Sequence, residues 1–215
     1  MAHIAVLGLG NWGTAIARLW LLEGHKVKGW TIEQEVYESI TMNEVNKKYL
    51  PNHPVPGLDA TMHLSEALEG SEIVVLAVPS SVILDVVEDV LPHLQPVHVL
   101  LDLAKGLAPG KRLISEAIEA RLKEEGMTNP LAVLTGPTIA PEAAGGVMTT
   151  ALVASEDQAI AQRLAQTLST PSFILHPASD PVGAELWGAY KNVVALACGL
   201  VDGLKQVGDL GGDNL

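Results

Sequence analysis

The stretch HIAVLGLGNWGTAIARLWLLEG, residues 3–24, decides the fold of this chain. Its opening residues, 3–7, form a short apolar run with β-branched members, which is typical of a strand. A glycine-rich turn follows, and apolar residues then recur at helical spacing until Gly24, a residue type that often ends a helix. A second strand is expected at 26–30. The stretch therefore predicts a βαβ unit of the kind that begins dinucleotide-binding folds.

The glycines of the turn, Gly8, Gly10 and Gly13, have separate roles in such a unit. Gly8 permits the tight turn, Gly10 lets the backbone approach a pyrophosphate, and Gly13 lets the helix pack closely on the strand. The free N–H groups at the helix N-terminus attract an anion. A GxGxxG turn also occurs for steric reasons alone, but the strand before it and the helix after it favour a dinucleotide site.

The composition indicates a globular chain and limits its partners. The chain has 215 residues, of which 48% are hydrophobic and 18% charged, enough for one large domain or for one domain and part of another. Thirteen basic residues against 25 acidic ones give a formal charge of −12, which argues against nucleic acid and anionic membranes as partners. The seven histidines show no metal-ligand spacing, so we expect no metal site.

The single cysteine and the N-terminal sequence bear on location. Cys198 excludes an internal disulfide and suits a reducing, cytoplasmic setting, and its apolar neighbours predict a buried, inert thiol. We expect no signal peptide, because His3 and the glycine turn interrupt the apolar run that a leader needs. No apolar run reaches the ~18 residues of a membrane span.

The residue that follows the second strand bears on the choice of cofactor. Glu33 lies 20 positions after Gly13, where dinucleotide folds place the acidic residue that binds the ribose hydroxyls of NAD. No arginine for a 2′-phosphate is nearby. This favours NAD over NADP, although Glu33 as a solvated residue at a helix start stays an alternative.

The rest of the chain alternates strands and helices. Residues 37–56 are polar and end in a proline-stiffened loop over 46–56. Beyond it, the pattern predicts strands starting at 61 and over 73–78, 98–103, 131–134, 149–154 and 173–176, and helices over 64–68 (capped by Ser65), 82–94, 111–125 and 156–168. The run at 73–78 is continuously apolar, as in a strand buried on both faces. The alternation predicts an α/β fold with a doubly wound, Rossmann-type parallel sheet over 1–178.

A different pattern starts near residue 179. Residues 182–200 read as one long, mostly buried helix whose few strongly polar members are Glu185, Lys191 and Asn192. A buried charge is costly unless it is paired or functional. Lys191 therefore either extends to the surface or is held at a site. We expect 179–215 to be the start of a separate helical domain.

Taken together, the motifs resemble the NAD(P)-dependent glycerol-3-phosphate dehydrogenase family. The resemblance covers nearly the whole chain and rests on the order of six motifs: GLGNWGTA at 8–15, NKKYLP at 46–51, AVPS at 77–80, AKG at 104–106, TGPTIAPE at 135–142 and ELWGAYKNV at 185–193. Ile139 stands where the family typically has phenylalanine, a mild departure.

The resemblance implies a role for particular residues. The turn glycines Gly8, Gly10 and Gly13 and the sheet edge at Pro79 are expected to meet NAD or NADP. To these the resemblance adds Asn11, Trp12, Lys105 and Ala140, with Ala140 at the nicotinamide end. It implies that the substrate contacts Lys105, Gly136, Thr138 and Asn192, and that Lys191 is the catalytic acid/base. The implied reaction is hydride transfer between the nicotinamide and dihydroxyacetone phosphate or sn-glycerol 3-phosphate, which feeds glycerophospholipid synthesis.

The chemistry of lysine suits this role. Reduction of a ketone places negative charge on its oxygen, and an ammonium group within hydrogen-bond reach stabilises that charge and delivers the proton. Burial and a second cation lower the pKa of a lysine toward the range of a proton shuttle, and Lys105 is the candidate for that second cation.

The family continues beyond the stretch that resembles 212–215, into a helical domain that completes the phosphate and cofactor sites. We therefore expect a fragment that binds dinucleotide weakly and turns over poorly or not at all. Without that domain the last helix should expose Leu186, Val193, Val194 and Leu196, which would favour aggregation or self-association, for example as a homodimer.

The sequence is also compatible with two other functions. One is a 6-phosphogluconate or 3-hydroxyacid dehydrogenase, which has a similar glycine turn and a lysine on a helix. The other is a module that binds a dinucleotide without catalysis.

Overall fold

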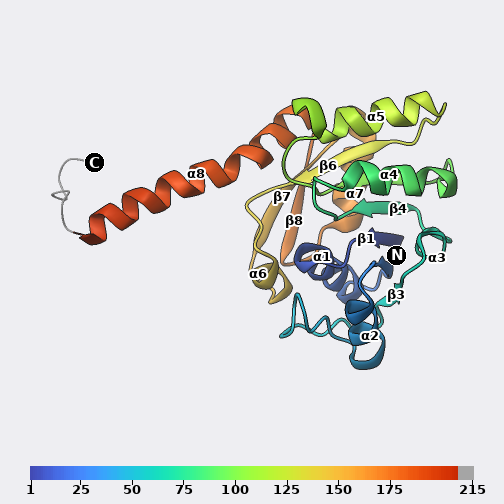
Figure 1. Ribbon diagram of the computed structural model, residues 1–215, viewed down its shortest axis with the longest axis horizontal. Helices are drawn as coiled ribbons and strands as arrows, with labels where there is room; N and C mark the ends of the chain where they lie inside the picture. The colour runs from blue at the N-terminus through green and yellow to red at the C-terminus, as the bar shows by residue number, and fades with distance from the viewer. Residues whose placement is uncertain (208–215) are drawn as a thin grey trace.

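The protein is built on one eight-stranded sheet with the strand order β3-β2-β1-β4-β5-β6-β7-β8 (Figure 1). The structure, a computed structural model, describes residues 1–207, without the side chains at 111 and 205–207. The strands are β1 (His3–Leu7), β2 (Lys26–Trp30), β3 (Asp59–Thr61), β4 (Ile73–Leu76), β5 (Val99–Asp102), β6 (Leu131–Thr135), β7 (Thr149–Ala154) and β8 (Phe173–Ala178). The predicted α/β, Rossmann-type fold is confirmed.

The sheet is parallel except at one pairing. β1 pairs in parallel with both β2 and β4, so that Val6 lies beside Gly29 and Val75. β6 and β7 run antiparallel, which contradicts the prediction of a wholly parallel sheet. The physical reason is the connection between them, whose only helix is the five-residue α6 (Ala140–Ala144). A parallel return needs a longer crossover that packs across the sheet.

Helices cover both faces of the sheet. One face packs against α1 (Asn11–Leu22), α2 (Gln34–Asn43) and α7 (Gln158–Leu168), and the other against α3 (Leu64–Leu68), α4 (Ile83–Val90) and α5 (Ile114–Glu124). Short 3-10 turns, η1 (Leu91–His93) and η2 (Pro109–Lys111), follow α4 and precede α5. Trp20 of α1 is fully buried, and its Nε1 donates to the carbonyl of Leu168, 3.0 Å away.

Several local predictions were wrong. No helix was predicted in the polar stretch after residue 37, but its first residues belong to α2, which buries only Val36 and Ile40 and therefore has a weak apolar pattern. Ser65 lies inside α3 and is not its cap; His63 takes that position without a side-chain hydrogen bond. The first residues of the helix expected at 111–125 form η2, and α5 begins at Ile114.

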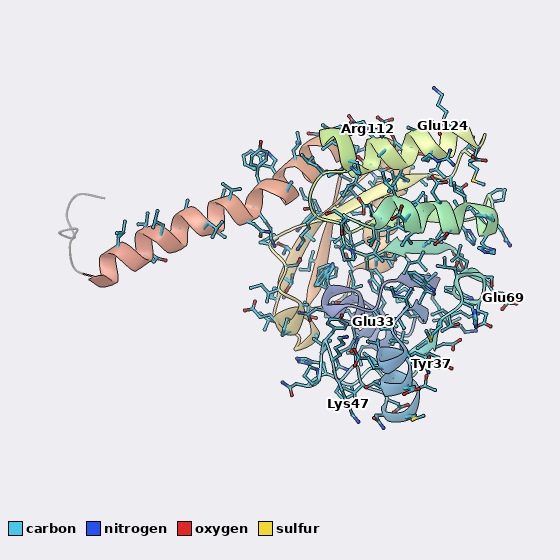
Figure 2. All side chains as sticks on the ribbon, in the orientation of Figure 1. Glu33, Tyr37, Lys47, Glu69, Arg112 and Glu124 are labelled. Carbon is cyan, nitrogen blue, oxygen red and sulfur yellow. The ribbon has the colours of Figure 1, made fainter. Side chains whose placement is uncertain are left out.

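The last helix, α8 (Pro181–Val207), extends away from the sheet (Figure 1). Its first turns contact α5, β6 and β7, and the side chains farther along have few neighbours (Figure 2). The prediction of a mostly buried helix is wrong, and so is that of a buried Cys198, which is exposed. The expected exposure of Leu186, Val193, Val194 and Leu196 is confirmed, with Leu196 75% exposed. The motif at 212–215 lies outside the described residues.

The exposed apolar residues of α8 do not make it a candidate membrane span. Within residues 1–207, no helix is both long enough and apolar enough to cross a bilayer.

Candidate functional site

The glycine turn has the geometry that its residues require. Gly8 has a φ of +106°, and a Cβ atom there would lie 2.8 Å from the carbonyl oxygen of Ala77. A Cβ on Gly13 would overlap the carbonyl oxygen of Gly8, so a larger residue would push α1 away from the turn. At Gly10, the cap of α1, a Cβ would meet nothing within 4 Å. The turn is therefore closed toward the sheet and open on its outer side.

This open side faces a cleft of about 890 Å³ beyond the carboxyl ends of β1, β4 and β5. Its lining combines residues 8–12 with Trp30, Glu33, Tyr49, Pro79 and Lys105. The first N–H groups of α1 have no side-chain cap, which leaves them available to an anion. A cleft at the switch point of a doubly wound sheet is where dinucleotides bind in such folds.

A buried asparagine that the sequence analysis did not single out supports the turn. Asn46 is fully buried, and its Nδ2 donates to the carbonyl of Leu9 and to Oγ1 of Thr14, each at 2.8 Å. Its Oδ1 accepts from the N–H of Tyr49. One amide group therefore joins the loop over 46–51 to the glycine turn.

Glu33 borders the same cleft and is already paired. Lys48 donates to Glu33 at 2.6 Å, and the hydroxyl of Tyr49 donates to it at 2.8 Å. The hydrogen bond from Lys48, followed by that from Tyr49, lowers the pKa of Glu33 below its ordinary value. Glu33 is labelled in Figure 2, close to the start of α2. The carboxylate is ionised at neutral pH and lines the cleft, and its contact with a ribose stays a prediction.

Two lysines meet at the other end of the cleft. Lys105, in the loop after β5, lines the cleft, and Lys191 of α8 lines a neighbouring cavity of about 460 Å³. Nζ of Lys191 donates to the carbonyl of Gly136, 3.4 Å away. Lys105 is exposed as a whole residue, but partial burial of its ammonium and then the positive charge of Lys191 lower the pKa of Lys105 to about 8. The predicted proximity of the two ammonium groups is present in the structure, and the lowered pKa belongs to Lys105.

The family follows from comparison with known proteins. The family model described as NAD-dependent glycerol-3-phosphate dehydrogenase N-terminus matches residues 3–161, most of the chain. The chain belongs to this family. The model described as the C-terminus of the same dehydrogenases matches residues 180–214.

Two curated relatives named glycerol-3-phosphate dehydrogenase [NAD(P)+] are longer than this chain. The relative from Fusobacterium nucleatum is 36% identical over 100% of this chain, and that from Rhodospirillum rubrum is 41% identical over 94%. The chain spans 62% and 57% of the lengths of these relatives. The crystal structure of glycerol-3-phosphate dehydrogenase from Coxiella burnetii is 34% identical, with a TM-score of 0.86 over 95% of this chain and 62% of that one.

The remaining residues to which the resemblance gives a role lie at different distances from the lysines. Thr138 is buried, and its N–H donates to the carbonyl of Gly136, the same oxygen that Lys191 contacts. Asn192, next to Lys191 in sequence, is exposed on another side of α8 with Ala195 and Leu196. The structure thus brings Gly136 and Thr138 to Lys191 but leaves Asn192 apart. The substrate-binding role of these residues stays a prediction.

Ala140 and Trp12 belong to a small apolar cluster between α6 and α1. Ala140 is buried there with Ala15 and Leu50, and Trp12 packs against the cluster while also lining the cleft. The ring of Trp12 also contacts Phe173 edge-on, with centroids 5.9 Å apart. Ala140 packs in this cluster and is not among the residues that line the cleft, so its contact with a nicotinamide stays a prediction.

Two buried acids that precede the lysines in the sequence were not predicted as site residues. Asp102 ends β5, three residues before Lys105, and Glu185 lies on α8, six residues before Lys191. Both are almost completely buried, at 0% and 2% exposed. The sequence did carry a signal for them, because each is an isolated acid in an apolar stretch. In the described residues, no three His, Cys, Asp or Glu side chains come together as a metal site requires.

Proposed function

We propose that the chain is the dinucleotide-binding part of an NAD(P)-dependent oxidoreductase that interconverts dihydroxyacetone phosphate and sn-glycerol 3-phosphate. The observation that carries this proposal is one continuous cleft with an anion-binding glycine turn at one end and Lys105, close to Lys191, at the other. In this proposal residues 1–178 bind the cofactor and residues from 179 onward begin a helical substrate domain.

The residues of the cleft fit a dinucleotide. The N–H groups at the start of α1 would hold the pyrophosphate, with Gly10 leaving room for its approach. Glu33 would accept hydrogen bonds from a ribose, which favours NAD over NADP. Asn11, Trp12 and Pro79 line the path toward the lysines. The bound nicotinamide would supply or accept the hydride.

The two lysines would stabilise the negative charges of the reaction and supply the proton. In the reducing direction the ammonium of Lys191 donates a hydrogen bond to the carbonyl oxygen and gives up its proton as that oxygen becomes an alkoxide, which yields the hydroxyl. The proton is later regained from solvent. Lys105 provides a second positive charge for the substrate phosphate. Gly136 and Thr138 would border the substrate beside Lys191.

A substitution at Gly10 tests the cofactor site without damaging the fold. Gly10 has a β-region backbone at the cap of α1, so aspartate there would stabilise the helix as a cap. Its carboxylate would also lie where the pyrophosphate is proposed to bind. We expect Gly10→Asp to keep or raise the thermal midpoint and to abolish NADH binding in a fluorescence titration. Gly10→Asn is the matched control for bulk, and we expect it to weaken binding less.

Turnover distinguishes catalysis from binding alone. We expect the chain to bind NADH and Lys191→Met to bind it equally well, because Lys191 lies outside the glycine turn. Oxidation of NADH dependent on dihydroxyacetone phosphate should be lost in Lys191→Met. Because we expect poor turnover from this chain alone, a full-length relative decides the question: NADH binding there without oxidation by dihydroxyacetone phosphate would replace the proposal with dinucleotide binding without catalysis. Activity with 6-phosphogluconate or a 3-hydroxyacid in its place would assign another dehydrogenase class.

A further inference from the structure

The buried carboxylate of Glu185 joins α8 to the N-terminus of α5. It accepts from the backbone N–H of Ile114 and from both the N–H and the hydroxyl of Ser115, the first two residues of α5. The cap residue of α5, Leu113, has no side chain able to accept a hydrogen bond. Glu185 therefore supplies from another helix the cap that α5 lacks, and the helix dipole stabilises its negative charge.

Asp102 fixes the start of the loop that carries Lys105. Its Oδ1 accepts from the N–H of Ala104 at 2.8 Å, and this hydrogen bond closes a turn from Asp102 to Ala104. Its Oδ2 is buried and has no hydrogen-bond partner among the described residues. Burial, and then the charge of the nearby Glu185, raise the pKa of Asp102 to about 8. Asp102 is therefore mostly protonated at neutral pH, and its charged neighbour is Glu185.

Each acid thus fixes the segment that carries one of the two lysines. One holds the loop of Lys105, and the other holds the helix of Lys191. Glu119 of α5 is a third acid nearby; its burial, followed by the charges of Glu156, Glu116 and Glu185, raises its pKa. No hydrogen bond joins Glu119 to the other two acids in the described residues.

We propose that Glu185 and Asp102 are positioning residues that set the separation of the Lys105 and Lys191 ammonium groups, Glu185 by anchoring α8 on α5 and Asp102 by fixing the loop after β5. The catalytic use of that separation rests on the proposed function. The separation itself does not, so the two can fail independently.

The pKa of Lys105 reports this separation, and its direction of change identifies the cause. Deleting a negative charge near a lysine destabilises the ammonium and lowers the pKa. Moving Lys191 away removes a repulsion and raises the pKa of Lys105. A positioning role and a direct charge effect of Glu185 therefore predict opposite signs.

The experiment measures the pKa of Lys105 by NMR in ¹³C-lysine-labelled chain, with its signal assigned through Lys105→Arg. Lys191→Met gives the benchmark, a rise from about 8 toward 10.5. We expect Glu185→Ala to produce a similar rise. Glu116→Gln, which removes an exposed charge from the first turn of α5, is the matched control and should change nothing. A folded Glu185→Ala chain with an unchanged or lower pKa of Lys105 would overturn the proposal.

If the alanine variant does not fold, Glu185→Gln serves under the same criterion. Glutamine keeps the side-chain length and one acceptor oxygen but loses the second, so we expect a smaller rise in the pKa of Lys105. No rise in the folded glutamine variant would count against the anchor.

Asp102 is tested by a pair of substitutions. Asparagine resembles the protonated carboxyl and can still accept from Ala104, so Asp102→Asn should leave the pKa of Lys105 unchanged. Asp102→Ala loses that hydrogen bond and should change it. Equal behaviour of the two variants would remove Asp102 from the proposal. Loss of positioning in Glu185→Ala together with no NADH binding by the unchanged chain would leave this inference standing and refute the proposed function.

Discussion

The sheet and the outer part of α8 are both rich in apolar residues, yet they have opposite environments. Leu76 and Leu101 in the central strands are completely buried, whereas Leu196 and Leu200 of α8 are mostly exposed. The strands lie between two layers of helices, and α8 has neighbours only along its first turns (Figure 1). Apolar composition therefore predicts that an element forms, while the layers around it decide whether it is buried.

The candidate site lies where these two regions meet. The sheet region provides the glycine turn, the cleft and Lys105, and the anchored start of α8 provides Lys191. A mutation in the sheet region should therefore affect both stability and binding. A mutation beyond the anchored turns of α8 should affect neither strongly.

The largest expected effect comes from the same substitution made at a glycine in each region. Gly13→Ala places a Cβ against the carbonyl of Gly8, and we expect it to destabilise the chain by about 3 kcal/mol and to abolish NADH binding. Gly199→Ala on α8 meets nothing within 4 Å and should stabilise the chain by up to about 1 kcal/mol, because alanine favours a helix. Urea unfolding measures both. Equal effects of the two substitutions would contradict the contrast between the regions.

The next effect concerns the support behind the glycine turn. Asn46→Ala leaves the carbonyl of Leu9 and the hydroxyl of Thr14 without their buried donor, and we expect a loss of about 2 kcal/mol in the free energy of unfolding. NADH binding should weaken as the turn loosens. The exposed Asn43→Ala, at the end of α2, is the control and should lie within about 0.5 kcal/mol of the unchanged chain. Equal losses for the two asparagines would show that the buried amide has no special role.

Sequence reasoning succeeded where a residue's role depends on its immediate neighbours. Gly8 and Gly13 could be interpreted because turn, strand and helix follow one another within 24 residues. It failed where the partner is distant in sequence: Asn46 contacts Leu9, 37 positions away, and Glu185 contacts Ser115, 70 positions away. The antiparallel direction of β7 and the helix α2, whose apolar pattern is weak, were missed for a related reason. Each depends on packing against distant parts of the chain, which local sequence periodicity does not show.

A smaller effect is expected in the pH dependence of binding at the junction of the two regions. Because the pKa of Lys105 is lowered to about 8, its positive charge is present below pH 8 and lost above it. NADH affinity should therefore fall as pH rises through 8. The unfolded chain keeps the proton up to its higher pKa, so holding this ammonium costs stability below pH 8, and the cost is relieved as the pH rises from 8 to 10.5.

Two variants assign that pH dependence. Lys105→Arg stays charged throughout and should remove the contribution of Lys105. Asp102 also titrates near pH 8 and becomes negative as pH rises, so Asp102→Asn should remove any contribution of its own. An affinity that falls identically in the unchanged chain and in Lys105→Arg would show that Lys105 is not the group responsible. Isothermal titration calorimetry with NADH at a series of pH values makes the measurement.

The smallest effect on stability is expected on the outer part of α8. Leu196 is 75% exposed, so Leu196→Ser should change the free energy of unfolding by less than about 0.5 kcal/mol. Leu101→Ala, in the fully buried β5, should cost about 2–5 kcal/mol by comparison. The same serine should reduce self-association in sedimentation velocity at high protein concentration, because it interrupts the apolar surface of the helix. A large loss of stability in Leu196→Ser would mean that a neighbour covers this part of α8 in solution. The two regions would then not differ in burial.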